Sequence, residues 1–234
     1  MRLTMPDRKP RQGFELLCEL VFRPLAHLVA LALLPLRVPP PAVVLAGTAV
    51  GLGAAVEIGR GAYLAAALLL QLKTVLDNAD GQLARMSGRI TAFGRYLDSE
   101  SDLLVDAAVF AALGLRVGPW FALAGFVFLT SVLSINFNLE RIHRGAAAGA
   151  SDGSLVARLY GIVYGPQDRF AEAIVRRPSA RTVGIAANFG LSTQLAALGL
   201  CLAFGHPRAY LVVLLVCTAI LVLLVAIDRG RSEP

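Results

Sequence analysis

Four of the five aspartates within residues 76–106 carry the strongest chemical signal in the 234-residue chain. Asp77 and Asp80 are three positions apart and Asp98 and Asp102 are four apart, so each pair would share one face of a helix. Carboxylates held this close repel one another unless a counter-charge is present. Their oxygens suit hard divalent cations, with Mg²⁺ favoured, Mn²⁺ as an alternative and Zn²⁺ disfavoured. The pattern predicts two divalent ions held by Asp77, Asp80, Asp98 and Asp102, an arrangement suited to displacement at phosphorus.

Small residues and one arginine accompany these acids. Gly81, Ala84 and Gly94 would leave the floor of the site open to a flat, bulky ligand, because they carry little or no side chain. Arg85 would supply a fixed cation for phosphate oxygens. The segment therefore has the parts of a site for a nucleotide or another phosphorylated ligand.

A short link joins the two acidic segments. Ser87 and Gly88 can end one helix, and Thr91 can cap the next. So short a connection makes the two helices antiparallel neighbours, and the four carboxylates would then converge.

Two further charged residues lie on the same helix faces. Lys73 precedes Asp77 by one turn, and two roles are open for it: binding an acceptor phosphate, or acting as the partner of a buried carboxylate. Asp106 extends the row begun by Asp98 and Asp102. A hydrogen-bonded structural role is favoured for it over contact with a substrate.

The composition indicates that these residues are positioned by membrane helices. Hydrophobic residues make up 56% of the chain and charged residues only 16%, and several uncharged runs are long enough to cross a bilayer. We therefore expect an all-α integral membrane fold, with residues 12–37 as an amphipathic interfacial helix or, less favoured, a first transmembrane helix. The predicted domains are residues 1–37, a six-helix domain over 38–228 with a loop at 141–180, and a tail at 229–234. The six predicted spans are 40–58, 61–85, 92–115, 118–139, 181–204 and 208–227.

The distribution of Lys and Arg predicts the orientation of these helices. Eighteen of the 22 Lys and Arg residues fall on the side that holds both termini and the acidic segment. The positive-inside bias places that side in the cytoplasm of a multi-pass cell-membrane protein. The net charge of +6 then reflects topology and attraction to anionic lipid, and no nucleic-acid partner is expected. Three isolated cysteines imply no disulfide framework.

The acidic segment also resembles a known family signature. The sequence Asp77-x-x-Asp80-Gly81-x-x-Ala84-Arg85, eight residues, Gly94, three residues, Asp98, three residues, Asp102 is similar to that of the CDP-alcohol phosphotransferases at every fixed position. The resemblance implies transfer of a phosphatidyl group from a CDP-alcohol, most simply CDP-diacylglycerol, to an acceptor alcohol in phospholipid biosynthesis, with release of CMP. It also implies a homodimer.

The resemblance assigns roles to individual residues. Asp77, Asp80 and Asp98 would hold the metals and, through them, the donor pyrophosphate. Asp102 would bind a metal and act as general base toward the acceptor hydroxyl. The donor pocket would be shaped by Gly81, Ala84, Arg85 and Gly94.

The acceptor is the most open part of this interpretation. Lys73, Arg141, Arg144 and Arg181 are the predicted acceptor-side residues, and they favour a small polar alcohol or its phosphate, of the inositol phosphate or glycerol phosphate type. For the three arginines, ordinary positive-inside anchoring is the favoured alternative. Ser134 leads into Ile135, without the tyrosine that often follows in members using phosphorylated acceptors. Two alternatives stay open: transfer from a soluble CDP-alcohol to a lipid, and a divalent-cation transporter, which would explain the acids but not the small residues.

Overall fold

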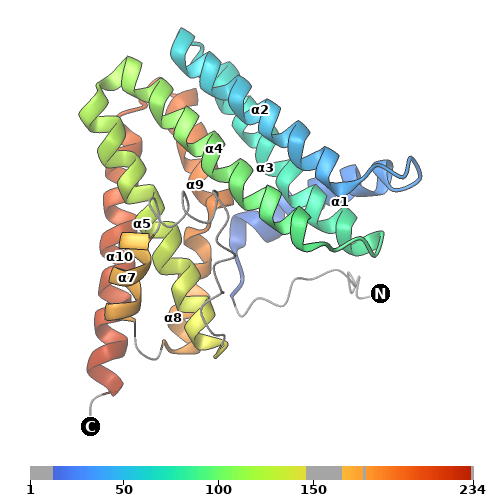
Figure 1. Cartoon of the computed structure of the whole chain (residues 1–234). Coiled ribbons are helices and arrows are strands. Elements are labelled where there is room, and N and C mark those ends of the chain that lie inside the picture. The colour runs from blue at the N-terminus through green and yellow to red at the C-terminus, as the bar shows by residue number, and fades with distance from the viewer. Residues whose placement is uncertain (1–12, 146–164, 176–177, 233–234) are drawn as a thin grey trace.

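The computed structural model describes residues 13–145, 165–175 and 178–232, and this part of the chain is helical, without strands (Figure 1). Two groups of helices make up the fold. In the first, α2 packs along α3 and α4, and α1 lies against α3; in the second, α5 packs against α7, α8 and α10. α9 contacts α3 and α4 contacts α5, which joins the groups. The helices are η1 Cys18–Phe22, α1 Arg23–Leu33, α2 Pro40–Arg60, α3 Tyr63–Met86, α4 Ala92–Val117, α5 Pro119–His143, α7 Gly165–Ile174, α8 Ala180–Ala186, η2 Ala187–Phe189, α9 Leu191–Ala203 and α10 Ala209–Ser232.

Local sequence rules explain the ends of α3 and α4. Ser87 is the C-cap of α3, and Gly88 follows with a φ of 67°, a left-handed conformation that glycine adopts readily. Thr91 caps α4 by accepting a hydrogen bond from the Gly94 amide at 3.0 Å. The predicted hairpin of two antiparallel helices is therefore present.

Two glycines of α2 allow that helix to approach the hairpin closely. A Cβ on Gly51 would lie 2.6 Å from Cγ1 of Val105 in α4, and a Cβ on Gly47 would lie 3.0 Å from Oδ1 of Asp77 in α3. Neither distance leaves room for a larger side chain. Gly47 and Gly51 thus serve helix packing, as small residues do between membrane helices.

The predicted span 181–204 is not one continuous helix. α8 gives way to the short η2, and Gly190 is extended (φ −66°, ψ 169°) before α9 begins. In this break the Asn188 side chain accepts a hydrogen bond from the Leu16 amide at 2.9 Å and donates one to the Phe14 carbonyl at 3.1 Å. The break therefore anchors the N-terminal segment, a contact that helix periodicity alone does not reveal.

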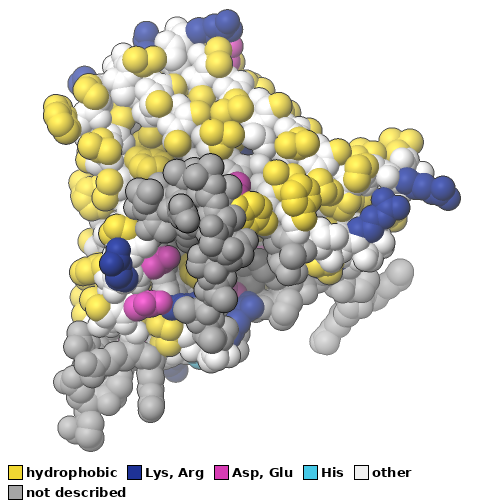
Figure 2. Space-filling view, in the orientation of Figure 1, with side chains coloured by type: hydrophobic (Ala, Val, Ile, Leu, Met, Phe, Trp, Pro, Cys, Tyr) yellow, Lys and Arg dark blue, Asp and Glu magenta, His cyan; other side chains and the backbone are white. Residues whose placement is uncertain are grey.

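Four helical segments in the described part of the chain are long and apolar enough to cross a bilayer. They are α2, α5, the α8–α9 segment Ala180–Ala203, and α10 over Ala209–Asp228. Figure 2 shows hydrophobic side chains over much of the visible surface, with Lys and Arg at its top edge, at its right-hand tip and beside the acidic side chains in its lower part. The chain is therefore an integral membrane protein.

The N-terminal helix, formed by η1 and α1, lies outside this set. The N-terminal helix buries Ala26 and Ala30 and exposes Leu20, Leu25 and Leu28, so its outer side is apolar. Whether it lies on or crosses the membrane stays a prediction.

Within the predicted loop 141–180, the structure contains the unpredicted helix α7, which docks on α5. Asp168 of α7 accepts hydrogen bonds from the side chains of Ser134 and Asn138. Positions 146–164 and 176–177 of that loop lie outside the described residues, as do 1–12 and 233–234 of the predicted terminal segments.

Candidate active site

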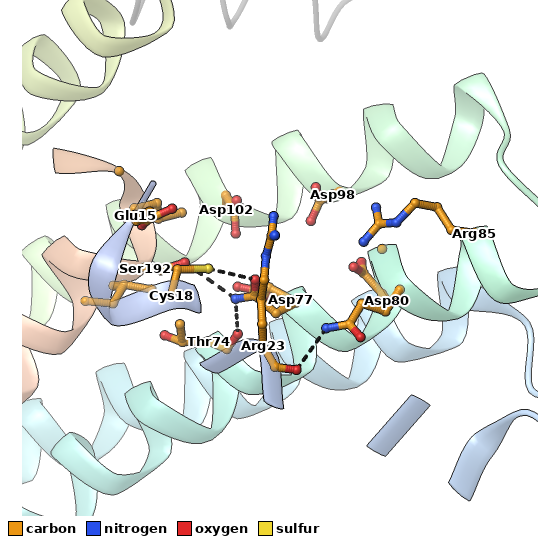
Figure 3. Close-up of a pocket in the computed structure, with 16 residues that line it drawn as sticks. Glu15, Cys18, Arg23, Thr74, Asp77, Asp80, Arg85, Asp98, Asp102 and Ser192 are labelled. Atoms are coloured by element: carbon orange, nitrogen blue, oxygen red, sulfur yellow. Dashed lines mark hydrogen bonds between the residues drawn. The ribbon is translucent and has the colours of Figure 1, made fainter. Parts of the chain in front are cut away.

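The acidic residues of α3 and α4 face one another across the hairpin (Figure 3). Asp77, Asp98 and Asp102 each offer a carboxylate oxygen, and these three oxygens all lie within 4.8 Å of one another. The side chains are half-buried, so their charges are only partly screened by solvent. A set of carboxylate oxygens at this spacing fits a hard divalent cation. Asp80, the fourth predicted ligand, is buried beside this set but does not belong to it.

Two adjoining cavities meet at these carboxylates. The larger, of about 210 Å³, is lined by Asp77, Asp102 and Arg85 among others. The smaller, of about 90 Å³, lies between the start of α2 and the hairpin and is lined by Ala84 and Gly94. Three residues line both cavities: Asp80, Gly81 and Asp98. A ligand that reaches from one cavity into the other would pass directly over the acidic cluster.

Arg85 stands over the glycine of the motif. A Cβ added to Gly81 would lie 3.4 Å from Nη1 of Arg85, so the absence of a side chain at 81 leaves space for the guanidinium. Arg85 lines the larger cavity together with the carboxylates. A planar guanidinium beside an acidic cluster can bind phosphate oxygens in two-pronged fashion while metals neutralise the acids.

Lys73 of α3 also contacts the acidic cluster. Its side chain is almost fully buried, and its ammonium forms ion pairs with both Asp77 and Asp102. Of the two roles left open by the sequence, the structure shows Lys73 as the partner of the carboxylates. A buried ammonium is stable only when it is paired in this way.

Asp106 lies one turn below Asp102 on α4 and is 2% exposed. Its Oδ2 is buried and has no hydrogen-bond partner within the part of the chain that the structure describes. The hydrogen-bonded role predicted for Asp106 is therefore not met at this oxygen. Buried carboxylate oxygens without partners are rare, because desolvation is not compensated.

The structure adds residues that sequence reasoning missed. Cys18 and Arg23 of the N-terminal helix, and Glu15 just before it, line the larger cavity together with Asn78 of α3 and Ser192 of α9. Arg23 forms an ion pair with Glu19 at 2.6 Å. The signal was present: Glu15, Glu19 and Arg23 recur every four residues in an otherwise apolar segment, which marks one polar helix face.

Polar side chains of α3 hold this wall in place. Gln82 Nε2 donates to the Arg23 carbonyl at 3.1 Å, and Cys18 Sγ donates to Asn78 Oδ1 at 3.2 Å. Asn78 is adjacent to Asp77, so the helix that carries the acids also fixes the N-terminal helix.

The three arginines predicted for the acceptor side lie elsewhere. Arg141 contacts Asn138 and Glu172, Arg144 pairs with Glu140 one turn away, and Arg181 is exposed at the start of α8. None of the three lines either cavity described above. The guanidinium groups of Arg141 and Arg144 contact local partners on α5 and α7, whereas Arg23 lines the larger cavity.

Comparison with known proteins agrees with the motif. The sequence model of the CDP-alcohol phosphatidyltransferase family matches residues 36–225. A bifunctional IPC transferase and DIPP synthase of Aquifex aeolicus is 38% identical over 90 residues, which are 36% of this chain and 21% of the relative. Phosphatidylinositol phosphate synthase of Streptomyces avermitilis is 37% identical over 38% of this chain and 35% of the relative. The enzyme of that name from Mycolicibacterium smegmatis is 33% identical over 57% of this chain and 62% of the relative.

The matched regions thus span less than two thirds of each of these relatives. A solved structure, that of Mycobacterium tuberculosis phosphatidylinositol phosphate synthase with CDP-DAG bound, covers 81% of this chain and 93% of its own. The two are 22% identical and superpose with a TM-score of 0.44.

Proposed function

Since the chain belongs to the CDP-alcohol phosphatidyltransferase family, we propose that it transfers a phosphatidyl group from CDP-diacylglycerol to a small polar alcohol phosphate and releases CMP. The observation that carries this proposal is the convergence of Asp77, Asp98 and Asp102 at the junction of two cavities. One cavity would take the nucleotide end of the donor and the other the acceptor. The names of the relatives, phosphatidylinositol phosphate synthases among them, favour inositol phosphate as that acceptor.

The smaller cavity suits the nucleotide. Gly81, Ala84 and Gly94 give it a floor with little side-chain bulk, against which a flat base can lie. Asp80 and Asp98 stand where it joins the larger cavity, so the donor pyrophosphate would lie beside the acidic cluster. Two Mg²⁺ ions, or Mn²⁺, held by Asp77, Asp80, Asp98 and Asp102, would neutralise the pyrophosphate oxygens and the departing CMP.

Asp102 is the proposed general base. Its carboxylate would take the proton of the acceptor hydroxyl as that oxygen forms a bond to the lipid-linked phosphorus. The bond from this phosphorus to the CMP oxygen breaks, and CMP leaves with the electron pair. Arg85 would bind phosphate oxygens at the reacting centre, because it lines the larger cavity together with Asp102.

The acceptor would enter the larger cavity, opposite the nucleotide. Arg23 and Arg85 both line it, so two cations border the space that a phosphorylated alcohol would occupy. In Figure 3, Arg23 and Arg85 come from different helices, and their guanidinium groups lie at about the height of Asp98 in the view. This supports a phosphate on the acceptor, with Arg23 in the role first predicted for Arg141, Arg144 and Arg181.

The membrane arrangement is part of the proposal. At 1.5 Å per residue, the 24 residues of α3 and the 26 of α4 extend beyond the roughly 30 Å of a bilayer core, so both can cross it beside α2. Six spans would return the chain to the cytoplasmic side, with the acidic cluster open to that side. A homodimer is also proposed, and a single-chain mass for the solubilised protein would contradict it.

The test is CMP release by the purified full chain in lipid, with CDP-diacylglycerol and a panel of acceptors. The panel contains inositol phosphate, glycerol phosphate, inositol, glycerol and serine, each with and without Mg²⁺. CMP release that depends on both Mg²⁺ and a phosphorylated acceptor supports the proposal. Divalent-cation flux into vesicles without CMP release would contradict it and favour a transporter.

A further inference from the structure

Lys73 is a buried cation inside a proposed metal site. Its ammonium contacts two of the three carboxylates that offer converging oxygens, Asp77 and Asp102. The residue is 1% exposed, and its stem lies against Gly51 of α2, where an added Cβ would stand 3.3 Å from Lys73 Cγ. The helix packing thus reserves space for this lysine beneath the cluster.

The same carboxylate oxygens cannot fully serve an ammonium and a divalent ion together. An ion held by Asp77, Asp98 and Asp102 would carry two positive charges close to the ammonium, and like charges at a few ångströms repel strongly in a half-buried site. Lysine carries its charge on a flexible four-carbon stem, so the ammonium can shift while the backbone stays in place.

A vacant acceptor for that ammonium lies nearby. Asp106 follows Asp102 by one turn on α4 and is buried, and its Oδ2 has no hydrogen-bond partner among the described residues. Lys73 already contacts Asp102, and Asp106 is one helical turn from that residue. After a shift of the ammonium, each cation would face carboxylates of its own. Asp77, Asp98 and Asp102 would face the divalent ion, and Asp106 would face the lysine.

We propose that Lys73 is a displaceable internal cation that pairs with Asp77 and Asp102 when the metal is absent and moves to Asp106 when a divalent ion binds. This rests on the proposed function, because it takes the acidic cluster as a divalent-ion site. Lys73 is then a positioning residue. It holds the carboxylates in place before the ion arrives and weakens ion binding by competition.

The test measures ion binding rather than turnover. Full-length protein in lipid nanodiscs is titrated with Mn²⁺, followed by electron paramagnetic resonance, and with Mg²⁺, followed by the rise in unfolding temperature. The variants are Lys73→Met, Asp106→Asn and the double substitution. Asp228→Asn, which alters a buried carboxylate of α10 that accepts from the Ser179 amide, is the control for loss of a buried acid.

The expected result is a pattern that a purely structural lysine would not produce. Lys73→Met tightens divalent-ion binding by about tenfold, because the competing charge is gone. Asp106→Asn weakens binding by about tenfold in the wild-type background, because the displaced ammonium loses its acceptor, but by less than about twofold when Lys73 is already Met. Asp228→Asn leaves ion affinity unchanged.

Two results overturn the inference while the proposed function stands: equal ion affinity in wild type and Lys73→Met, or the same effect of Asp106→Asn in both backgrounds. If Lys73→Met does not fold, Lys73→Gln replaces it, since the amide keeps a hydrogen-bond donor without the charge. Absence of ion binding to the wild type would overturn the proposed metal centre, and this inference with it.

Discussion

Gly47 of α2 lies directly against Asp77 of α3, and a Cβ at position 47 would stand 3.0 Å from Oδ1 of that aspartate. The position of Asp77, a proposed metal ligand, therefore depends on glycine at position 47 of the neighbouring helix. The contact links the packing of the first apolar span to the chemistry of the acidic hairpin.

Gly47→Ala should lower the rate of CMP release by about tenfold, because displacing Asp77 by a few tenths of an ångström misaligns a reacting centre. Gly59→Ala on the same helix is the matched control, since no atom of the described residues lies within 4 Å of its added methyl. Gly59→Ala should leave the rate unchanged and raise stability slightly, through higher helix propensity. Equal rates in the two variants would contradict this role of Gly47.

Arg23→Gln should raise the KM for a phosphorylated acceptor by about tenfold or more, because a charge-assisted contact to phosphate is lost. The KM for CDP-diacylglycerol should change much less. Arg141→Gln is the control, since its guanidinium faces Glu172 and Asn138. If Arg141→Gln raised the acceptor KM and Arg23→Gln did not, the acceptor would bind where the sequence first suggested.

Asp168→Ala should destabilise the protein by about 1–3 kcal/mol, because buried Ser134 and Asn138 both donate to this carboxylate and would lose their partner. Thermal unfolding in detergent measures the effect. Glu172→Ala, on the same helix, removes a half-exposed ion pair with Arg141 and should change stability by no more than about 1 kcal/mol. Similar losses for both variants would show that α7 is not held by Asp168.

The hairpin could be predicted from sequence because its determinants are local. The spacing of Asp98 and Asp102 assigns them to one helix face, and Ser87, Gly88 and Thr91 are the residue types that end and begin helices. These rules need no knowledge of the rest of the chain. The convergence of the acids follows from them.

The rest of the cavity wall depends on contacts between distant segments. Gln82 binds the Arg23 carbonyl across 59 positions, and Asn188 binds the backbone of Phe14 and Leu16 across more than 170. No periodicity encodes which polar groups will meet in this way. The acceptor-side role of Arg141 is predicted from its position near a helix end. Its contact with Glu172 of α7 depends on the fold, so that position does not reveal it.

Asp102 is the proposed general base. Acceptor-dependent CMP release from CDP-diacylglycerol should fall by at least about a hundredfold in Asp102→Asn, because general-base catalysis typically contributes this much. Asp228→Asn, a buried carboxylate outside both cavities, should retain wild-type release. Near-wild-type release of CMP by folded Asp102→Asn would contradict the general-base role of Asp102.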